Sequence, residues 1–228
     1  MAVSVDTVYQ RVLAILNKEQ RGYVTPQEFN LFANQAQLDI FEQYFYDINQ
    51  FGRMHGNDTE YSDMLSVLNE KINIFETNGN MTYSSNYWST PSDLYRLGTI
   101  IYNNIEAERV NANEYLYINA SPLTKPTNDR PIFVASTSGY KVYGASELTS
   151  GVSCNYIKKP ATVAWGYNTV SGQALYNASN STNFELHPSE ETELVFKILQ
   201  LAGLSIKELQ VYQIGNQMEA QNTQQEKS

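Results

Sequence analysis

The chain has 228 residues, of which 42% are hydrophobic, enough to form the core of one large domain or two small ones. Its 24 acidic residues outnumber its 15 Lys and Arg residues, and the formal net charge of -9 argues against a nucleic-acid-binding surface, which depends on clustered positive charge. The N-terminus lacks the basic and apolar segments of a secretory signal, and no apolar stretch is long enough to cross a bilayer, so we expect neither secretion by the usual route nor a membrane location.

Two helices are predicted at the start of the chain. The first ends between Lys18 and Gly22. It is marked by apolar residues at helical spacing: Val5, Val8, Val12 and Ile15 or Leu16. The second begins at Thr25-Pro26-Gln27-Glu28, a capping box in which Thr25 accepts from the amide of Glu28 and Glu28 reaches back. It runs to about Ile48, with an apolar face wide enough to contact two neighbours.

A third helix is predicted from Tyr61 to Phe75, and Asn78-Gly79 is expected to end this helical block, residues 1–80. Residues 81–183 are different, because alternating β-branched and aromatic residues between short turns are typical of strands. The expected strands are Leu94 to Tyr102, Arg109 to Ile118, Pro131 to Ala135, Tyr140 to Tyr143 and Val152 to Ile157. They indicate a small antiparallel sheet inserted between helices, and Trp165 to Asn183 is expected to be a loop.

The C-terminal region begins with a strongly marked helix. His187 is the predicted N-cap, Pro188 suits the first helical position, and the helix dipole favours the glutamates that follow. Residues 184–206 are therefore expected to rejoin the helical block. Residues 207–228, rich in Gln and Asn, cannot close a core and are expected to be a C-terminal docking arm. Its candidate interface residues are Leu209, Val211, Tyr212, Ile214 and Met218. The order of segments predicts an α+β fold.

Residues 17–28 align with a calcium-binding loop of the EF-hand type, with Gly22 at the turn position. The candidate metal ligands are Asn17, Glu19 and Glu28. Arg21, however, places a cation where a carboxylate should bind. The capping box at Thr25 explains the same residues without an ion, so we expect neither a metal nor a cofactor.

Catalysis has few candidate residues. A general base would have to be His55, in a Gly-flanked loop, or His187, which is explained as a helix cap. The single cysteine, Cys154, excludes an internal disulfide and is expected on a buried strand. Because phosphate loops and dinucleotide fingerprints are absent as well, we expect that the chain is not an enzyme.

The composition instead favours contact surfaces, since 17 Tyr residues accompany only 17% charged residues. Protein interfaces are enriched in aromatic residues and depleted in Lys and Glu. Some of these tyrosines are expected to pack in the sheet and helices. The clusters Tyr44-Phe45-Tyr46 and Tyr83 to Trp88 exceed what one core can hold, which favours assembly over catalysis.

Several segments resemble a known family: VYQRVLAILNKEQRGYVTPQEFNLFANQAQLDIFEQYF, PSDLYRLGTIIYNN, NANEYLYINASPLTKPTNDRPIF, SGVSCNYIKKP and NFELHPSEETELVFKILQLAGLSIKE. Together they look like virion structural proteins of short-tailed bacteriophages (podoviruses), including crAss-like phages, over nearly the whole chain. Within such virions, proteins of this size with a helical block, a small sheet and an extended C-terminus are similar to head-to-tail connector proteins, also called adaptor or ring proteins.

This resemblance implies a non-catalytic homo-oligomeric ring, commonly of twelve copies, that contacts the portal protein and further ring or tail proteins. It implies a location in the neck and tail region of the virion after synthesis in the host cytoplasm, and a C-terminal segment that threads along a neighbouring subunit. Genome DNA would pass through the channel without specific binding, which the acidic balance suits. Two alternatives stay open: a receptor- or carbohydrate-binding tail protein, and a calcium-binding module at residues 17–28.

Overall fold

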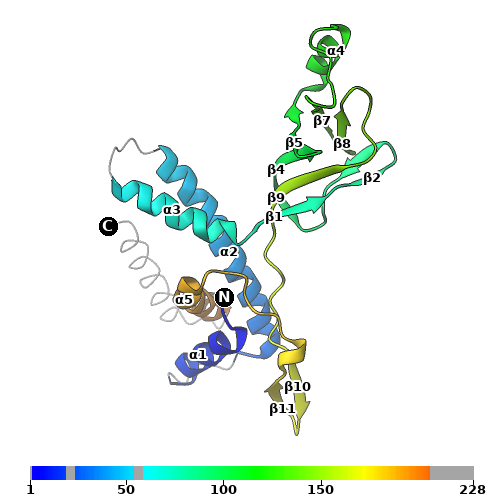
Figure 1. Cartoon of the computed structure of the whole chain (residues 1–228). Helices are drawn as coiled ribbons and strands as arrows, with labels where there is room; N and C mark the ends of the chain where they lie inside the picture. The colour runs from blue at the N-terminus through cyan, green and yellow to red at the C-terminus, as the bar shows by residue number, and fades with distance from the viewer. Residues whose placement is uncertain (1, 19–23, 54–58, 206–228) are drawn as a thin grey trace. The chain divides into compact units, whose positions relative to one another are not determined.

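The computed structural model describes residues 2–18, 24–53 and 59–205. They form two compact units (Figure 1): a helical unit, which contains the residues up to Ile74 and those from Pro160 onward, and a β unit, residues 75–159, inserted between them along the chain. Helices and mainly antiparallel sheets in separate segments confirm the predicted α+β class. The units divide the chain at 74/75 and 159/160, whereas the sequence suggested a β region over 81–183.

The helical unit packs its C-terminal helix against the N-terminal ones. Its helices are α1 (Val5–Lys18), α2 (Pro26–Arg53), α3 (Thr59–Asn73) and α5 (Glu191–Ser205), the last preceded by the 3-10 turn η2 (Pro188–Glu190). Since α2 contacts both α3 and α5, its wide apolar face has the two neighbours that the sequence predicts. Fully buried side chains form the core: Phe29, Ile40, Phe41, Phe184, Leu194 and Ile198. None of the described helices is long and apolar enough to cross a membrane.

Two helix starts confirm the predicted capping. The Thr25 hydroxyl accepts the Glu28 amide at 3.3 Å, and the Glu28 carboxylate accepts the Thr25 amide at 2.9 Å, which completes the capping box. Near the other end of the chain, Nδ1 of His187 accepts the Ser189 amide at 3.3 Å, and Pro188 occupies the first position of the turn. Both caps satisfy amides that have no partner within their helix.

Side-chain amides of α2 hold the extended segment that follows the β unit, residues 160–165. Asn34 accepts the Val163 amide at 2.8 Å and donates to the Val163 carbonyl at 2.9 Å. Asn30 makes the same two bonds to Trp165, at 2.7 Å and 3.4 Å. Each asparagine therefore replaces the strand neighbour that an extended backbone would otherwise need.

Gln37 continues this pattern one turn further along α2. It is 2% exposed, donates to the Ala161 carbonyl at 2.9 Å and accepts the Glu185 amide at 3.1 Å. The Glu185 carboxylate in turn accepts the Ala161 amide at 2.9 Å. The segment at Ala161 and the segment at Glu185 are thus joined to α2 and to each other. We refer to Asn30, Asn34 and Gln37 as the amide ladder.

Two sheets surround the core of the β unit. In one, the strand order is β1 (Glu76–Asn80), β9 (Val152–Lys158), β4 (Leu94–Tyr102) and β5 (Ile105–Glu106). In the other, it is β2 (Thr82–Ser84), β3 (Tyr87–Ser89), β8 (Gly139–Tyr143), β7 (Ile132–Ser136) and β6 (Glu108–Arg109). Only β6 and β7 are parallel. Buried side chains from both sheets form one cluster, which includes Trp88, Ile100, Phe133, Val142 and Cys154.

The predicted strand from Arg109 to Ile118 is wrong. Its first residue ends β6, and the chain then enters helix α4 (Ala112–Ala120). The Glu114 carboxylate accepts the Asn111 amide at 3.1 Å, so a capping box starts this helix. The alternation of aromatic and polar residues in this segment suits a strand, but the local cap favours a helix.

The expected end of the helical block at Asn78-Gly79 is also wrong, because both residues lie within β1, opposite Asn155 and Cys154 of β9. A glycine among polar residues indicates a turn when only the sequence is known. Here its small size is required by packing, since a Cβ on Gly79 would lie 2.9 Å from the ring of Tyr156.

The expected loop from Trp165 to Asn183 contains a β-hairpin. Strand β10 (Tyr167–Val170) pairs with β11 (Gln173–Tyr176), and the 3-10 turn η1 (Ala178–Asn180) follows. The connecting residues Ser171 and Gly172 have φ angles of 52° and 81°, as a two-residue hairpin turn requires. A Ser-Gly pair between two short runs that mix polar and apolar residues indicates a hairpin turn, and the prediction of a loop overlooked it.

Replacing Asn34 with alanine removes both bonds to Val163 and leaves a partly buried amide and carbonyl without these partners. We expect the free energy of unfolding to fall by about 2 kcal/mol, measured by urea denaturation. Asn49→Ala is the control, because Asn49 is exposed on the same helix and donates to the Phe45 carbonyl of that helix. Its effect should stay within about 0.5 kcal/mol. Equal losses in the two variants would contradict a specific role for the ladder.

Candidate functional site

The calcium-loop pattern falls at the end of α1 and the start of α2. Asn17 lies in α1, and the Glu28 carboxylate accepts the amide and the hydroxyl of Thr25 at 2.9 Å and 2.8 Å. These two bonds, the backbone one foremost, lower the pKa of Glu28. Glu19 lies outside the described residues. Over the described ranges, no three His, Cys, Asp or Glu side chains gather where they could hold a metal ion.

The two described catalytic candidates have structural roles. His187 is a helix cap, and its Nδ1 lies 2.8 Å from the Ser189 hydroxyl. Cys154 is fully buried on β9, which confirms the predicted strand position. Burial raises the pKa of the Cys154 thiol, and Asp93 adds to the effect, so the thiol stays protonated and is a poor nucleophile near neutral pH. His55 lies outside the described residues.

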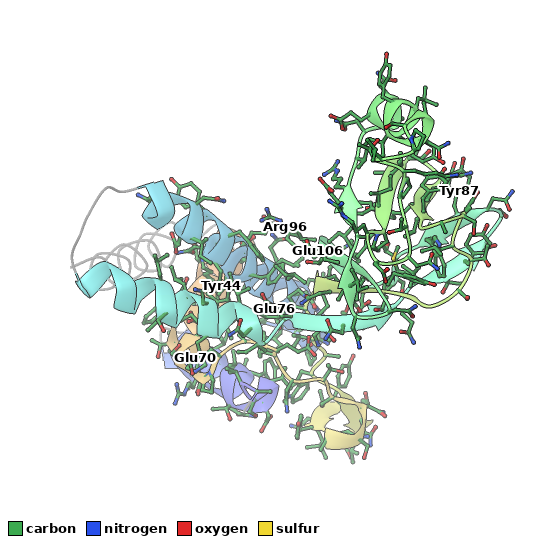
Figure 2. All side chains as sticks on the ribbon, turned by 45° about the horizontal axis from the view of Figure 1, so that its top comes forward. Tyr44, Glu70, Glu76, Tyr87, Arg96 and Glu106 are labelled. Carbon is green, nitrogen blue, oxygen red and sulfur yellow. The ribbon has the colours of Figure 1, made fainter. Side chains whose placement is uncertain are left out.

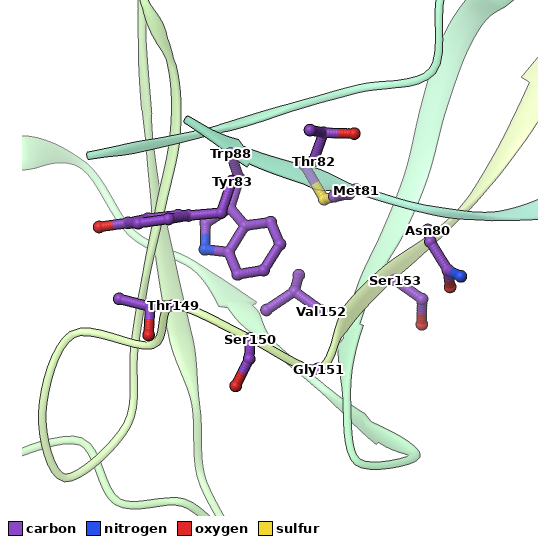
Figure 3. A pocket seen from close by; sticks show the side chains of 10 residues that line it. All are labelled: Asn80, Met81, Thr82, Tyr83, Trp88, Thr149, Ser150, Gly151, Val152 and Ser153. Atoms are coloured by element: carbon purple, nitrogen blue, oxygen red, sulfur yellow. The ribbon is translucent and has the colours of Figure 1, made fainter. Parts of the chain in front are cut away.

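A groove of about 530 Å³ opens beside β2 and β3 of the β unit, and its lining carries no charged side chain (Figure 3). The rings of Tyr83 and Trp88 lie together, 5.2 Å apart, and the polar side chains of Asn80 and Ser153 lie at the other end. Trp88 is 3% exposed and its indole donates to the Leu148 carbonyl at 2.9 Å, so its ring belongs mainly to the core. The groove offers a neutral polar ligand one half-buried ring, that of Tyr83.

Helix α4 and the loop after it carry the most exposed large apolar side chains of the β unit. Leu116 is 67% exposed, Tyr117 79% and Leu123 95%. We call these three residues the tip surface. No residue of α4 is buried, although a helix of nine residues gains little stability on its own in water. Beneath it, the ring of Tyr115 stacks on that of Tyr143 at 4.2 Å. An apolar surface of this kind is typical of a contact site for another protein.

Charge is divided unevenly between the two units. In the β unit, seven basic residues balance seven acidic ones: Arg96, Arg109, Lys125, Arg130, Lys141, Lys158 and Lys159 against Glu76, Asp93, Glu106, Glu108, Glu114, Asp129 and Glu147. Both signs occur on its exposed surface, for example at Arg96 and Glu106 (Figure 2). The net charge of -9 therefore lies entirely in the helical unit. Surfaces without net charge associate more readily than surfaces that repel.

The β10–β11 hairpin is fixed to the helical unit at its base by Trp165. The Trp165 indole donates to the Asp6 carboxylate at 2.9 Å, and its ring centroid lies 4.4 Å from that of Tyr9. On the hairpin side, the same ring lies 5.9 Å from Tyr167 and 5.7 Å from Tyr176. An aromatic cluster thus joins the first helix to both strands of the hairpin.

Beyond this base, the hairpin carries exposed apolar side chains. Val170 and Leu175 are each 52% exposed, and Tyr176 is 40% exposed. No charged residue occurs in the sequence between Lys159 and Glu185, a run that contains the whole hairpin. Neither this hairpin nor α4 was predicted, although Ser171-Gly172 and the spacing of Asn111 and Glu114 indicate them.

The predicted aromatic clusters are only partly exposed. Tyr46 is 66% exposed, but Tyr44 is buried at 4%, and Trp88 belongs to the core. The candidate interface residues of the docking arm, Leu209, Val211, Tyr212, Ile214 and Met218, lie outside the described residues.

No family model matches the chain, and no curated protein matches it. The function has to be inferred from the surfaces described above.

Burial, together with the nearby Tyr115 and Glu147, raises the pKa of Tyr143 to about 12. Because folding then favours the protonated phenol, this group should reduce the stability of the fold as pH rises from about 10, where an unfolded tyrosine ionises, to about 12. Replacing Tyr115 with phenylalanine should lower the pKa of Tyr143. NMR titration of ring-labelled tyrosine measures it, and an unchanged pKa in the variant would contradict the coupling.

Proposed function

We propose that this chain is a structural component of a bacteriophage virion and that it forms a connector or adaptor ring between the portal protein and the tail. The observation that carries this proposal is a β unit without net charge that presents the uncovered apolar tip surface. The resemblance of the sequence to virion structural proteins adds the kind of assembly. In this proposal the chain is not an enzyme.

Electrostatics restricts how copies of this chain can meet. Helical units that carry the whole net charge of -9 repel one another, so contacts through the β unit or the uncharged hairpin cost less electrostatic free energy. Exposed apolar side chains on one of those surfaces then add the free energy of burial. The same acidic unit would not hold DNA that passes through a channel, which suits a conduit for the genome.

Replacing both Leu116 and Leu123 with aspartate should weaken assembly at the tip surface, because it adds charge to an apolar contact. We expect the natural chain to form a ring, alone or with portal protein, and the double variant to remain largely monomeric, as measured by native mass spectrometry and particle imaging. Leu31→Asp is the control, since Leu31 is a 71% exposed leucine of the helical unit, and it should assemble normally. A natural chain that stays monomeric and ignores portal protein would refute the ring.

Deleting residues 209–228 tests the docking arm. The deletion should leave the melting temperature within a few degrees of that of the full chain, because the described core ends with α5. Binding to the portal protein, measured by co-sedimentation, should be impaired. Undiminished portal binding would refute the docking role of residues 209–228 and leave the proposed ring unaffected.

A receptor- or carbohydrate-binding tail protein is the second candidate, favoured by the uncharged groove with Tyr83 at one end and Asn80 at the other. It predicts glycan binding by a monomer. A glycan array would detect this binding, and Tyr83→Ala should abolish it.

A further inference from the structure

We propose that the β10–β11 hairpin is a strand-pairing element and that it pairs with the β unit of a second copy of this chain. The proposal rests on the ring suggested above and adds a second contact between neighbouring copies, besides the one at the tip surface. It places the donor strand in the helical unit of one copy and the acceptor strand, β1, in the β unit of the next.

The hairpin has two free edges. It forms a sheet of two strands, so each strand exposes one row of backbone amides and carbonyls. Natural sheets usually protect such edges with charged side chains, proline or a β-bulge. This hairpin contains no charged residue and no proline, and its pairing register from Tyr167↔Tyr176 to Val170↔Gln173 has no bulge. An edge without protection is suited to pairing with another strand.

The base of the hairpin keeps it in place for such a partner. Trp165 is bound through its backbone by Asn30 and through its indole by Asp6. Further backbone bonds join Ala164 to Thr182 at 3.2 Å and 2.8 Å on the side away from the turn. An isolated two-stranded hairpin is marginally stable in water. Fixing its base therefore lowers the entropy lost when a third strand is added.

Among the described strands of the β unit, β1 is the best acceptor. The sheets end at β1, β5, β2 and β6. β5 and β6 are two residues long and carry Glu106, Glu108 and Arg109, whereas β2 has three residues. β1 has five residues, one more than either hairpin strand, and its only charge is Glu76 at its first position. An uncharged donor and a nearly uncharged acceptor bring no repulsion between copies that are acidic overall.

This pairing uses two different surfaces on each copy. A contact of that kind is heterologous, because the hairpin of one copy meets β1 of the next, whose own hairpin stays available. Heterologous contacts repeat around an axis and generate closed rings when the rotation closes. The strand pairing is therefore compatible with a ring, whereas two hairpins that pair only through the same edge would close as a dimer.

Backbone geometry identifies the amides involved. The two-residue turn closes on Val170 and Gln173, so this pair exchanges hydrogen bonds within the hairpin. Thr169 and Ala174 form the next pair, in which the amides point outward. These two amides, together with those of Tyr167 and Tyr176 in the next outward pair, are the ones that a third strand would bind.

Thr169→Pro removes an outward amide of β10, and Ala174→Pro removes one of β11, without removing a bond within the hairpin. We expect the proline variant on the edge that pairs to need a protein concentration about tenfold or more higher for half of the chains to assemble, as measured by mass photometry. Thr169→Val is the control, since it keeps the amide and adds no charge, and it should assemble like the natural chain. Near-UV circular dichroism and melting temperature show whether the proline variants keep their fold.

Hydrogen exchange on the natural chain tests the proposal without a substitution. Assembly should slow exchange of the Thr169 or Ala174 amide and of amides in β1 at least tenfold, relative to the chain diluted below its assembly concentration. A natural chain that forms rings while these amides exchange as fast as in the monomer overturns the hairpin pairing and leaves the ring intact. Protection by portal protein alone, without a second copy, also overturns it. A chain that never assembles overturns both proposals.

Discussion

The amide ladder on α2 is the interaction on which the helical unit depends. A side-chain amide donates and accepts at once, so Asn34 satisfies both backbone groups of Val163, and Asn30 does the same for Trp165. The pairing is possible because four residues of a helix and two residues of a strand advance by similar lengths, about 6 Å and about 7 Å. This match positions Trp165, the anchor of the hairpin, and through Gln37 it fixes the backbone beside the buried Phe184.

Much of this architecture could be predicted from local signals. The capping box at Thr25 and the cap at His187 each lie within four residues, and both helix starts were located from the sequence. The strands β4, β7, β8 and β9 alternate clearly enough to be recognised. The ladder could not be predicted, because Asn and Gln on the polar side of a helix resemble a solvated face, and their partners lie more than a hundred residues away.

The candidate surfaces were harder to predict than the fold. Exposed aromatic residues were expected, but Tyr44 and Trp88 are in cores. Leu116 and Val170 are exposed in segments that were predicted as a strand and a loop, and Leu123 is exposed in the connection between two predicted strands. Hydrophobic periodicity identifies apolar residues that should be buried, but it does not show whether the chain itself or another molecule buries them. The charge pattern was visible in the sequence, but its meaning required the unit boundaries at 75 and 159.

The two ends of the β unit lie side by side. β1 pairs with β9 from Glu76↔Ile157 onward, and the Lys158 amide donates to the Phe75 carbonyl at 2.9 Å. Closely spaced ends are what allow a domain to be inserted into, or removed from, a loop of its host. The β unit therefore has the properties of an insertable domain: a short glycine linker from residue 74 to residue 160 could replace it, and it could be inserted into a loop of an unrelated protein.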